Sequence, residues 1–151
     1  MNLLLNPGFE LDSNGNNRPD HWTSNSRFTR TSAQTHSGFY AGKHSATDNS
    51  SYTIAQTINN LSAGTTYSFE GWANIPPTSD SFNFKLQVIW RNSKNKPIGT
   101  STIKSYTTST GGWEQVTANL VAPAGTANAQ AWMVVTSLKA TIYVDDFIFR
   151  M

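Results

Sequence analysis

Side chains able to carry acid–base or metal chemistry are scarce in this sequence. It has 9 Asp and Glu residues, 3 His residues and no Cys, so a thiol nucleophile and a Cys-based zinc site are excluded. Acid–base hydrolysis uses a pair of carboxyl groups, which lie about 5–9 Å apart in glycosidases. Glu70 is expected on the outer face of a strand but has no obvious carboxylate partner, and no His stands in a HExxH-type metal motif. The sequence therefore predicts a protein that is not an enzyme.

Two strand-like runs carry a different chemistry on their polar faces. In Phe82–Arg91 the even-numbered apolar residues suit a core, which turns Gln87 outward. In Ala127–Ser137 the odd-numbered apolar residues suit a core, which turns Gln130 and Trp132 outward. A flat indole ring stacks on the apolar C–H face of a sugar, while amides hydrogen-bond its hydroxyl rim.

A third run, Thr66–Asn74, turns Glu70 and Trp72 outward by the same alternation. If this run joins the same sheet as the other two, two tryptophans and two glutamines share one outer face. Such a face combines a ring for stacking with planar groups for hydrogen bonding, as sugar recognition requires.

The elements that position these side chains are short strands separated by turn signals every 8–12 residues. No window of eleven residues has a helical period, and aromatic residues make up 12% of a chain with only 13% charged residues. The pattern predicts an all-β fold, a two-sheet antiparallel β-sandwich of the jelly-roll type, with a closed barrel as the alternative. The expected strands are Trp22–Arg30, Tyr40–Lys43, Tyr52–Thr57, Thr66–Asn74, Phe82–Arg91, Trp113–Val121, Ala127–Ser137 and Thr141–Arg150.

Length and charge limit the organisation and the partners. A chain of 151 residues fits a single domain spanning 1–151. The net charge is only +2 and the basic residues are scattered, so nucleic-acid binding is not expected. No apolar run approaches the roughly 20 residues of a membrane span. The start MNLLLN lacks the features of a signal peptide, so we expect a module excised from a larger secreted protein.

An ordered set of motifs resembles the β-sandwich carbohydrate-binding modules of the family 4, 16 and 22 type, with the family 16 type preferred. The motifs, in chain order, are Asn6-Pro7-Gly8-Phe9-Glu10, His21-Trp22, Ser37-Gly38-Phe39-Tyr40-Ala41-Gly42-Lys43, Leu61-Ser62-Ala63-Gly64, Gly112-Trp113, Val121-Ala122-Pro123-Ala124-Gly125 and Tyr143-Val144-Asp145-Asp146-Phe147. Together they span almost the whole chain.

The resemblance implies a non-catalytic, extracellular module. Its expected partner is a plant cell-wall-type polysaccharide, cellulose-type β-1,4-glucan or mannan, and it would hold an attached glycoside hydrolase on that substrate as a monomer. Family 22 xylan binders usually carry Tyr and Glu on the strand that here bears Gln130, Trp132 and Thr136. That difference argues against xylan as the main ligand.

The resemblance also orders the candidate ligand-binding residues. Trp22 and Trp132 are the expected stacking platforms, with Gln87 as a hydroxyl partner. Further candidates are Trp72, Gln130 and Glu70. Trp90 and Trp113 are instead expected in the core, because tryptophan is mostly buried in folded proteins.

A structural calcium ion joining the two chain ends is likewise implied by the resemblance. Glu10 and Asp146 are the expected side-chain ligands, and Gly8 and Lys43 the expected backbone carbonyl ligands. Strand alternation points Asp145 and Asp146 to opposite faces, so only one of them is expected to bind the ion. The alternative makes Glu10 a turn cap and Asp146 a partner for Lys or Arg.

Two other functions stay open at this point. The same sandwich serves as a cell-surface interaction or structural domain without a sugar site. A small lyase or hydrolase is the other possibility, and the shortage of acids argues against it.

Overall fold

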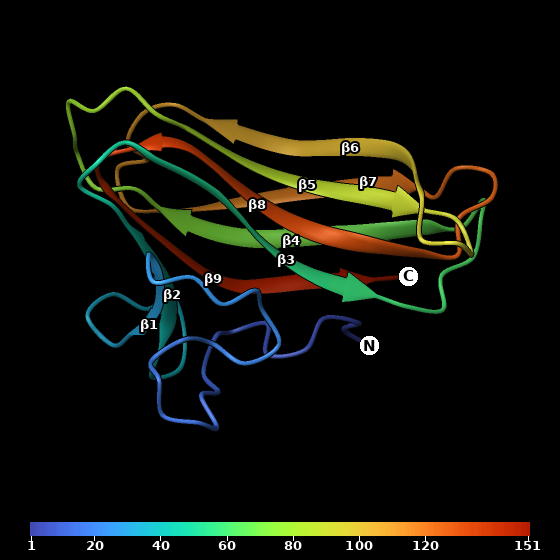
Figure 1. Ribbon diagram of the computed structural model, residues 1–151, viewed down its shortest axis with the longest axis horizontal. Coiled ribbons are helices and arrows are strands. Elements are labelled where there is room, and N and C mark those ends of the chain that lie inside the picture. Colours follow the sequence, from blue (N-terminus) through green and yellow to red (C-terminus); the bar gives the residue numbers. More distant parts are fainter.

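Alternating apolar and polar residues fold the chain into nine antiparallel strands in two stacked sheets (Figure 1). The computed structural model describes residues 1–151, and none of its elements is a helix able to cross a membrane. The predicted two-sheet sandwich is confirmed. The five-stranded sheet has the order β1 (Phe28–Thr31), β2 (Ala41–Ser45), β9 (Thr141–Arg150), β4 (Thr66–Asn74) and β7 (Trp113–Val121). The four-stranded sheet has the order β3 (Ser50–Ile58), β8 (Asn128–Leu138), β5 (Asn83–Arg91) and β6 (Pro97–Tyr106).

A single apolar core fills the space between the sheets. Every second residue of β4, β5 and β8 is buried there, as the period-2 pattern predicts. The largest fully buried side chains include Trp90, Tyr67 and Phe147. The polar residues of these strands consequently face outward on two separate surfaces, one for each sheet.

Strand β6 was not predicted from the sequence. It lies at the edge of the four-stranded sheet, and of its ten residues only Tyr106 is buried. An edge strand covers little core and so needs few apolar residues, which leaves no alternation to detect. The predicted strand Trp22–Arg30 is also shorter than expected, because regular pairing begins at Phe28.

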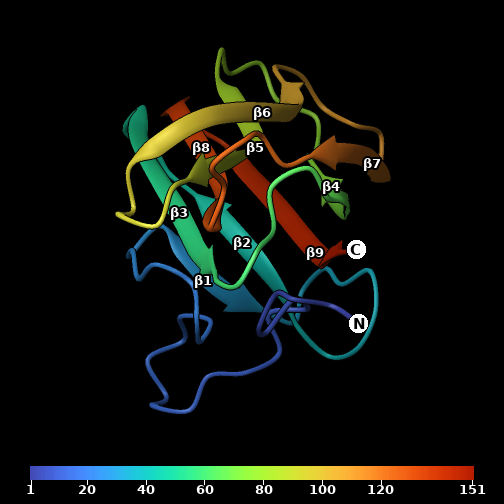
Figure 2. The same ribbon diagram turned by 90° about the vertical axis from the view of Figure 1, so that its right-hand side faces the viewer.

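The two chain ends lie side by side (Figures 1 and 2). The backbone N–H of Leu3 donates to the Phe149 carbonyl at 2.7 Å, and that of Phe147 donates to the Pro7 carbonyl at 3.1 Å. The Asn2 side chain adds hydrogen bonds to the backbone of Phe147 and Phe149. These contacts hold the N-terminal segment along the last strand.

A β-bulge interrupts the pairing of β4 with β9. Trp72 faces Asp145 and Glu70 faces Ile148, so Gly71 faces two residues, Asp146 and Phe147. Asp146 adopts a φ of 50°, the left-handed conformation common in the first residue of a bulge. The bulge redirects the Asp146 side chain and lays the Phe147 ring over Gly71.

Gly71→Ala is expected to destabilise the fold, because a Cβ at this position would lie 2.7 Å from Phe147 Cδ1. Overpacking of this kind costs about 1–3 kcal/mol. Chemical denaturation of the variant and the wild type measures the difference. Gly64→Ala is not a suitable control because Gly64 has a positive φ, whereas Ser62→Ala alters an exposed turn residue and should change little. Unchanged stability of Gly71→Ala would contradict this account of the bulge.

Candidate functional site

The outer face of the four-stranded sheet brings three predicted ligand-binding residues together. Trp132 stands on β8 between Ala55 of β3 and Gln87 of β5, its direct cross-strand neighbours. The predicted proximity of Gln87 and Trp132 is therefore confirmed. This surface, called the Trp132 face, consists of Thr53, Ala55, Thr57, Lys85, Gln87, Ile89, Thr100, Thr102, Gln130, Trp132 and Val134.

Hydrogen bonds within the Trp132 face fix its side chains. The indole Nε1 of Trp132 donates to Gln130 Oε1 at 3.0 Å, and Gln130 Nε2 donates to Thr57 Oγ1 at 3.1 Å. On the other side of Trp132, Gln87 Nε2 donates to Thr102 Oγ1 at 3.0 Å. The Gln87 carbonyl oxygen makes no hydrogen bond to protein and can accept one from a ligand. The half-buried indole is thus held on a polar surface with free amide groups beside it.

Trp22 does not contribute a stacking platform, so this prediction is wrong. Its side chain is buried, with 6% of the residue exposed, and its Nε1 donates to the Asn6 carbonyl at 3.0 Å. The centroid of its ring lies 5.2 Å from the centroid of the Phe9 ring and 6.0 Å from that of the Phe147 ring. The segment around Trp22 closes one part of the core instead of starting an exposed strand.

Glu70 and Trp72 point outward as predicted, but from the opposite side of the molecule. They belong to β4 of the five-stranded sheet, whereas Gln87 and Trp132 belong to the other sheet. The expected single face with two tryptophans and two glutamines is therefore wrong. Alternation fixes the direction of each side chain within its strand, and it does not fix the sheet that the strand joins.

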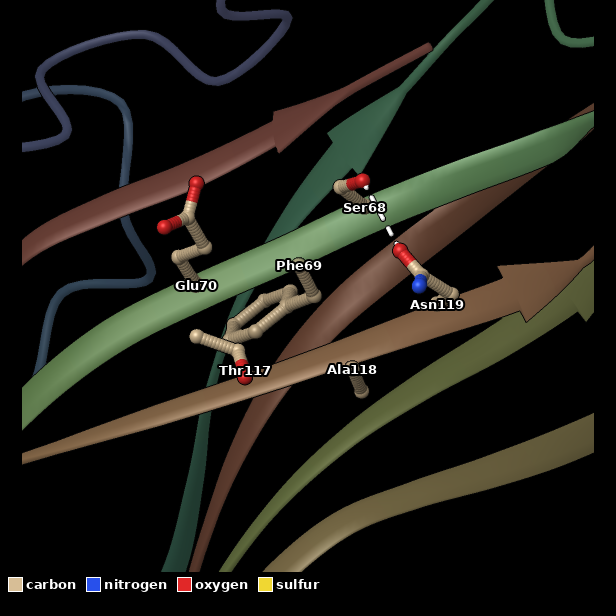
Figure 3. A pocket seen from close by; sticks show the side chains of 6 residues that line it. All are labelled: Ser68, Phe69, Glu70, Thr117, Ala118 and Asn119. Carbon is tan, nitrogen blue, oxygen red and sulfur yellow. Dashed lines mark hydrogen bonds between the residues drawn. The ribbon is translucent and has the colours of Figure 1, made fainter.

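A shallow, open pocket of about 300 Å³ lies on this opposite surface, between β4 and β7 (Figure 3). Ser68 and Glu70 point into it from β4, and Thr117 and Asn119 from β7. Glu70 lies 3.8 Å from the Arg150 guanidinium, and no second carboxylate lines the pocket. The pocket therefore lacks the paired acids of a glycosidase. The Trp132 face has no comparable cavity and is an open surface.

Trp72 is half-covered beside this pocket. The imidazole of His36 stacks on Trp72 with ring centroids 3.8 Å apart. The same imidazole lies edge-on to Trp113, with ring centroids 5.8 Å apart. Trp113 is partly exposed on β7, so its predicted core position is wrong, whereas Trp90 is buried as predicted. With one ring face occupied by His36, Trp72 is a poorer stacking platform than Trp132.

The carboxylates of Asp145 and Asp146 and the side-chain stem of Glu10 surround Gly8, where the N-terminal segment crosses β9. A Cβ on Gly8 would lie 3.6 Å from Asp146 Oδ1, 3.7 Å from Asp145 Oδ1 and 3.7 Å from Glu10 Cγ. The expectation that the two aspartates point to opposite faces is wrong, because the bulge breaks the alternation. Both instead bind the segment at His36: its backbone N–H donates to Asp145 Oδ2 at 2.9 Å, and its Nδ1 lies 2.6 Å from Asp146 Oδ2.

Glu10 is held by the neighbouring turn. Its two carboxylate oxygens accept hydrogen bonds from the backbone N–H groups of Phe39 and Tyr40, at 2.9 and 3.0 Å. Gly38, with a φ of 66°, makes room for it, since a Cβ there would lie 2.9 Å from the carboxylate. Lys43 lies within β2, paired with Thr29 and Tyr143, and its carbonyl as a calcium ligand stays a prediction.

The donor set at this crossing consists of oxygen atoms, which suits calcium in its chemistry. However, no three His, Cys, Asp or Glu side chains lie together in a group that could hold a metal ion. Burial raises the pKa of Asp145 to about 6. The desolvated carboxyl of Asp145 and the neighbouring acids would be stabilised by a cation.

Two stacked antiparallel sheets with adjacent chain ends are the fold found in β-sandwich carbohydrate-binding modules. No model of a known protein family matches the sequence, and no curated protein is significantly similar to it.

Solved structures support this assignment of the fold. The C-terminal family 22 carbohydrate-binding module of Clostridium thermocellum Xyn10B superposes with a TM-score of 0.69 at 14% identity, covering 96% of this chain and 90% of that one. The module TmCBM61, solved with β-1,4-galactotriose, gives 0.71 at 18% identity, covering 100% and 99%. Family 16 carbohydrate-binding module-2 gives a TM-score of 0.68 at 17% identity, covering 99% of this chain and 100% of that one.

A structure of tailspike protein 4 from bacteriophage CBA120 contains the same fold within a larger protein. The TM-score is 0.78 at 14% identity, and the match covers 99% of this chain but 21% of that one. The fold thus occurs both as a free-standing module and as one part of a long chain. The similarity to modules of families 22, 61 and 16 is of equal degree and does not favour one of them.

Proposed function

We propose that the chain is a non-catalytic polysaccharide-binding module that uses the Trp132 face. The observation that carries this proposal is the pair Trp132 and Gln87: an indole and an amide with a free acceptor, side by side on an open sheet surface. An open surface suits the middle of a long polymer, which has no end to fit a closed pocket.

Each group on the face has a separate part in binding. The indole of Trp132 stacks on the apolar face of a pyranose ring, where it replaces water on both surfaces. The Gln87 carbonyl accepts a hydrogen bond from an equatorial hydroxyl, and the second N–H of Gln130 donates one. Because Trp132, Gln130 and Thr57 are already joined by hydrogen bonds, little side-chain freedom is lost on binding.

The ligand class that we propose is a β-1,4-linked chain, a glucan or a mannan. Such an exposed and hydrated site should bind with a Kd of about 1–100 μM, or about −5.5 to −8 kcal/mol. The affinity is sufficient for a module that acts by keeping an attached glycoside hydrolase at its substrate outside the cell. A similar family 22 module is a xylan-binding domain and TmCBM61 was solved with β-1,4-galactotriose, so these sugars belong in the test.

Isothermal titration calorimetry with cellohexaose, mannohexaose, xylohexaose and β-1,4-galactotriose tests the proposal. We expect saturable binding of cellohexaose or mannohexaose, together with a change in tryptophan fluorescence from the partly exposed Trp132. Binding of xylohexaose alone would reject glucan and mannan as the ligand class but would leave the Trp132 face as the proposed binding site. A flat titration with every sugar would favour the alternative, a cell-surface interaction domain without a sugar site.

We also propose a structural calcium ion bound by Glu10 and Asp146, next to the Gly8 backbone. The proximity of Glu10, Asp145 and Asp146 around Gly8 supports it. When bound, the ion supplies positive charge that offsets the repulsion of the three carboxylates. It would also hold the N-terminal segment, the segment 36–40 and β9 together, which are separate parts of the chain.

Removal of calcium is expected to lower the melting temperature. At a tenfold excess of calcium over its Kd, the bound ion stabilises the folded state by roughly 1.4 kcal/mol. For a chain of this length that corresponds to about 3–6 °C. Differential scanning fluorimetry in EDTA and in excess calcium measures the shift. Glu10→Gln is expected to reduce the shift, whereas Glu114→Gln, a surface control, should leave it unchanged. An equal shift in wild type and Glu10→Gln would reject this site.

A further inference from the structure

The loop from Asp12 to Asp20 has the donor spacing of a calcium-binding loop. In the EF-hand loop the ligands come from positions 1, 3 and 5, from the backbone carbonyl at 7, from position 9, often through a water, and from a bidentate Glu at 12. With Asp12 as position 1, Asn14 and Asn16 occupy positions 3 and 5, Arg18 supplies the carbonyl at 7, and Asp20 occupies 9. This chain has Thr23 at position 12, so only the first nine positions match. The loop belongs to the N-terminal segment, drawn in blue below the sheets in Figure 1.

The backbone of the loop has the sharp turn that this spacing requires. The EF-hand loop has a glycine at position 6 for that turn. Asn17 occupies the position here with a φ of 62°, and asparagine is among the few residues that adopt this left-handed conformation readily. Gly15 provides a second left-handed residue, with a φ of 69°. The departure from glycine at position 6 therefore preserves the turn.

Side-chain oxygens in the loop are oriented by backbone N–H groups further along it. Asp12 Oδ2 accepts from Asn17 N–H at 2.7 Å, which turns the Asp12 carboxylate toward the inside of the loop. Asn14 Oδ1 and Asn16 Oδ1 accept from the N–H groups of residues 16 and 18. At the far end, Asp20 Oδ2 accepts from Ser13 N–H at 3.0 Å, which brings the Asp20 carboxylate back to the start of the loop.

A buried carboxylate oxygen in the loop supports cation binding independently of the donor spacing. Asp12 Oδ1 is buried and has no hydrogen-bond partner, and only 2% of the Asp12 side chain is exposed. The Arg30 guanidinium approaches the other oxygen, Oδ2, at 3.9 Å, and its Nη1 donates to the Glu10 carbonyl. Its Nε is also buried without a partner, so direct pairing with Arg30 is the competing explanation. A buried, unpartnered carboxylate oxygen is costly and requires a cation or a donor.

We propose that the loop 12–20 binds a calcium ion through Asp12 and Asp20, the amide oxygens of Asn14 and Asn16, and the Arg18 carbonyl. This site is distinct from the carboxylates of Glu10, Asp145 and Asp146, which contact the segment 36–40. Two carboxylates and two neutral amides give a low ligand charge, so the affinity belongs to the weak class of extracellular modules, with a Kd of about 0.1–1 mM. An ion here would fix a long surface loop beside the core residue Trp22.

Calcium titration of the full chain, followed by ¹H–¹⁵N NMR, tests the proposal. We expect the backbone amides of residues 12–18 and 20 to shift with a Kd of about 0.1–1 mM, and to shift equally in Glu10→Gln. Asp12→Asn and Asp20→Asn should each weaken this event at least about tenfold. Asp48→Asn is the matched control, because it removes an equivalent charge from an exposed aspartate outside the loop.

Three results would overturn the loop site. The first is the absence of any shift of the loop amides up to 10 mM calcium, a concentration about tenfold above the weakest expected Kd. The second is an unchanged calcium affinity in Asp12→Asn together with a lower melting temperature, which would assign Asp12 to Arg30 alone. The third is loss of the loop shifts in Glu10→Gln. If only the Glu10 site is wrong, calcium would still shift the amides of the loop 12–20, and Asp12→Asn would remove those shifts.

Discussion

Trp132→Ala is expected to weaken oligosaccharide binding by roughly 100-fold, and so to move a micromolar Kd into the millimolar range. The variant removes the only aromatic ring of the Trp132 face, and buried aromatic anchors at binding sites contribute about 2 kcal/mol or more. A loss of about 2.7 kcal/mol corresponds to this factor. Titration calorimetry with the best-bound hexaose gives the Kd of the variant and of the wild type.

Trp72→Ala is the matched control, since it removes the same side chain from the opposite outer face. Its Kd is expected to stay within about twofold of the wild-type value, because the ligand does not contact that sheet. Trp132→Phe keeps a flat ring and should retain part of the affinity. Undiminished affinity in Trp132→Ala, or lost affinity in Trp72→Ala alone, would place the sugar on the other face.

Acidification is expected to destabilise the fold through His44. This residue is fully buried: Tyr52 Oη lies 2.8 Å from its Nδ1, Met133 Sδ lies 3.5 Å from its Nε2, and the rings of Phe28 and Phe84 pack against it. Burial lowers its pKa from 6.5 to about 3. No carboxylate contacts the ring to compensate a positive charge.

The sign follows from proton uptake. Between pH 6.5 and about 3 the unfolded chain holds a proton on His44 and the folded chain does not, so stability falls as pH falls. The slope is about 1.4 kcal/mol per pH unit, or roughly 3 kcal/mol between pH 6.5 and 4.5. Above pH 6.5, His44 is neutral in both the folded and the unfolded chain and no longer lowers the stability.

Asp145 acts in the opposite direction, because its raised pKa favours the folded state as pH falls through about 6. The difference in stability between the wild type and His44→Gln does not contain the Asp145 contribution, since Asp145 is present in both proteins. Urea unfolding of both proteins from pH 7.5 to 4.5 measures the difference in stability. We expect the two curves to converge, or cross, as pH falls. Parallel curves would mean that His44 is protonated within the folded protein.

Much of the fold could be predicted because strand alternation is a local property. The buried and exposed sides of β4, β5 and β8 follow from the residues of each strand alone. Strand β6 was missed because an edge strand with one buried residue lacks that signal. The calcium-type spacing in the loop 12–20 was present in the sequence, where turn residues obscured it.

The candidate site was predicted less completely. Alternation correctly turned Trp132, Gln87 and Gln130 outward, and the structure places them on adjacent strands of one sheet. Trp22 was misplaced because its neighbours in sequence do not show that Phe9 and Phe147, from both chain ends, enclose its ring. The direction of the Asp146 side chain depends on a β-bulge, and the residues around Asp146 do not predict that bulge.

By itself the sequence determined a cysteine-free all-β sandwich, the inward and outward sides of its main strands, and the few acids available for metal or catalysis. Only the tertiary structure decided that Trp72 and Glu70 lie on one outer face and Trp132 and Gln87 on the other. It also decided that Trp22 is buried and that Asp145 and Asp146 face one segment. The reason is physical: side-chain direction along a strand is set by adjacent residues, whereas sheet membership, bulges and burial depend on pairing between distant segments.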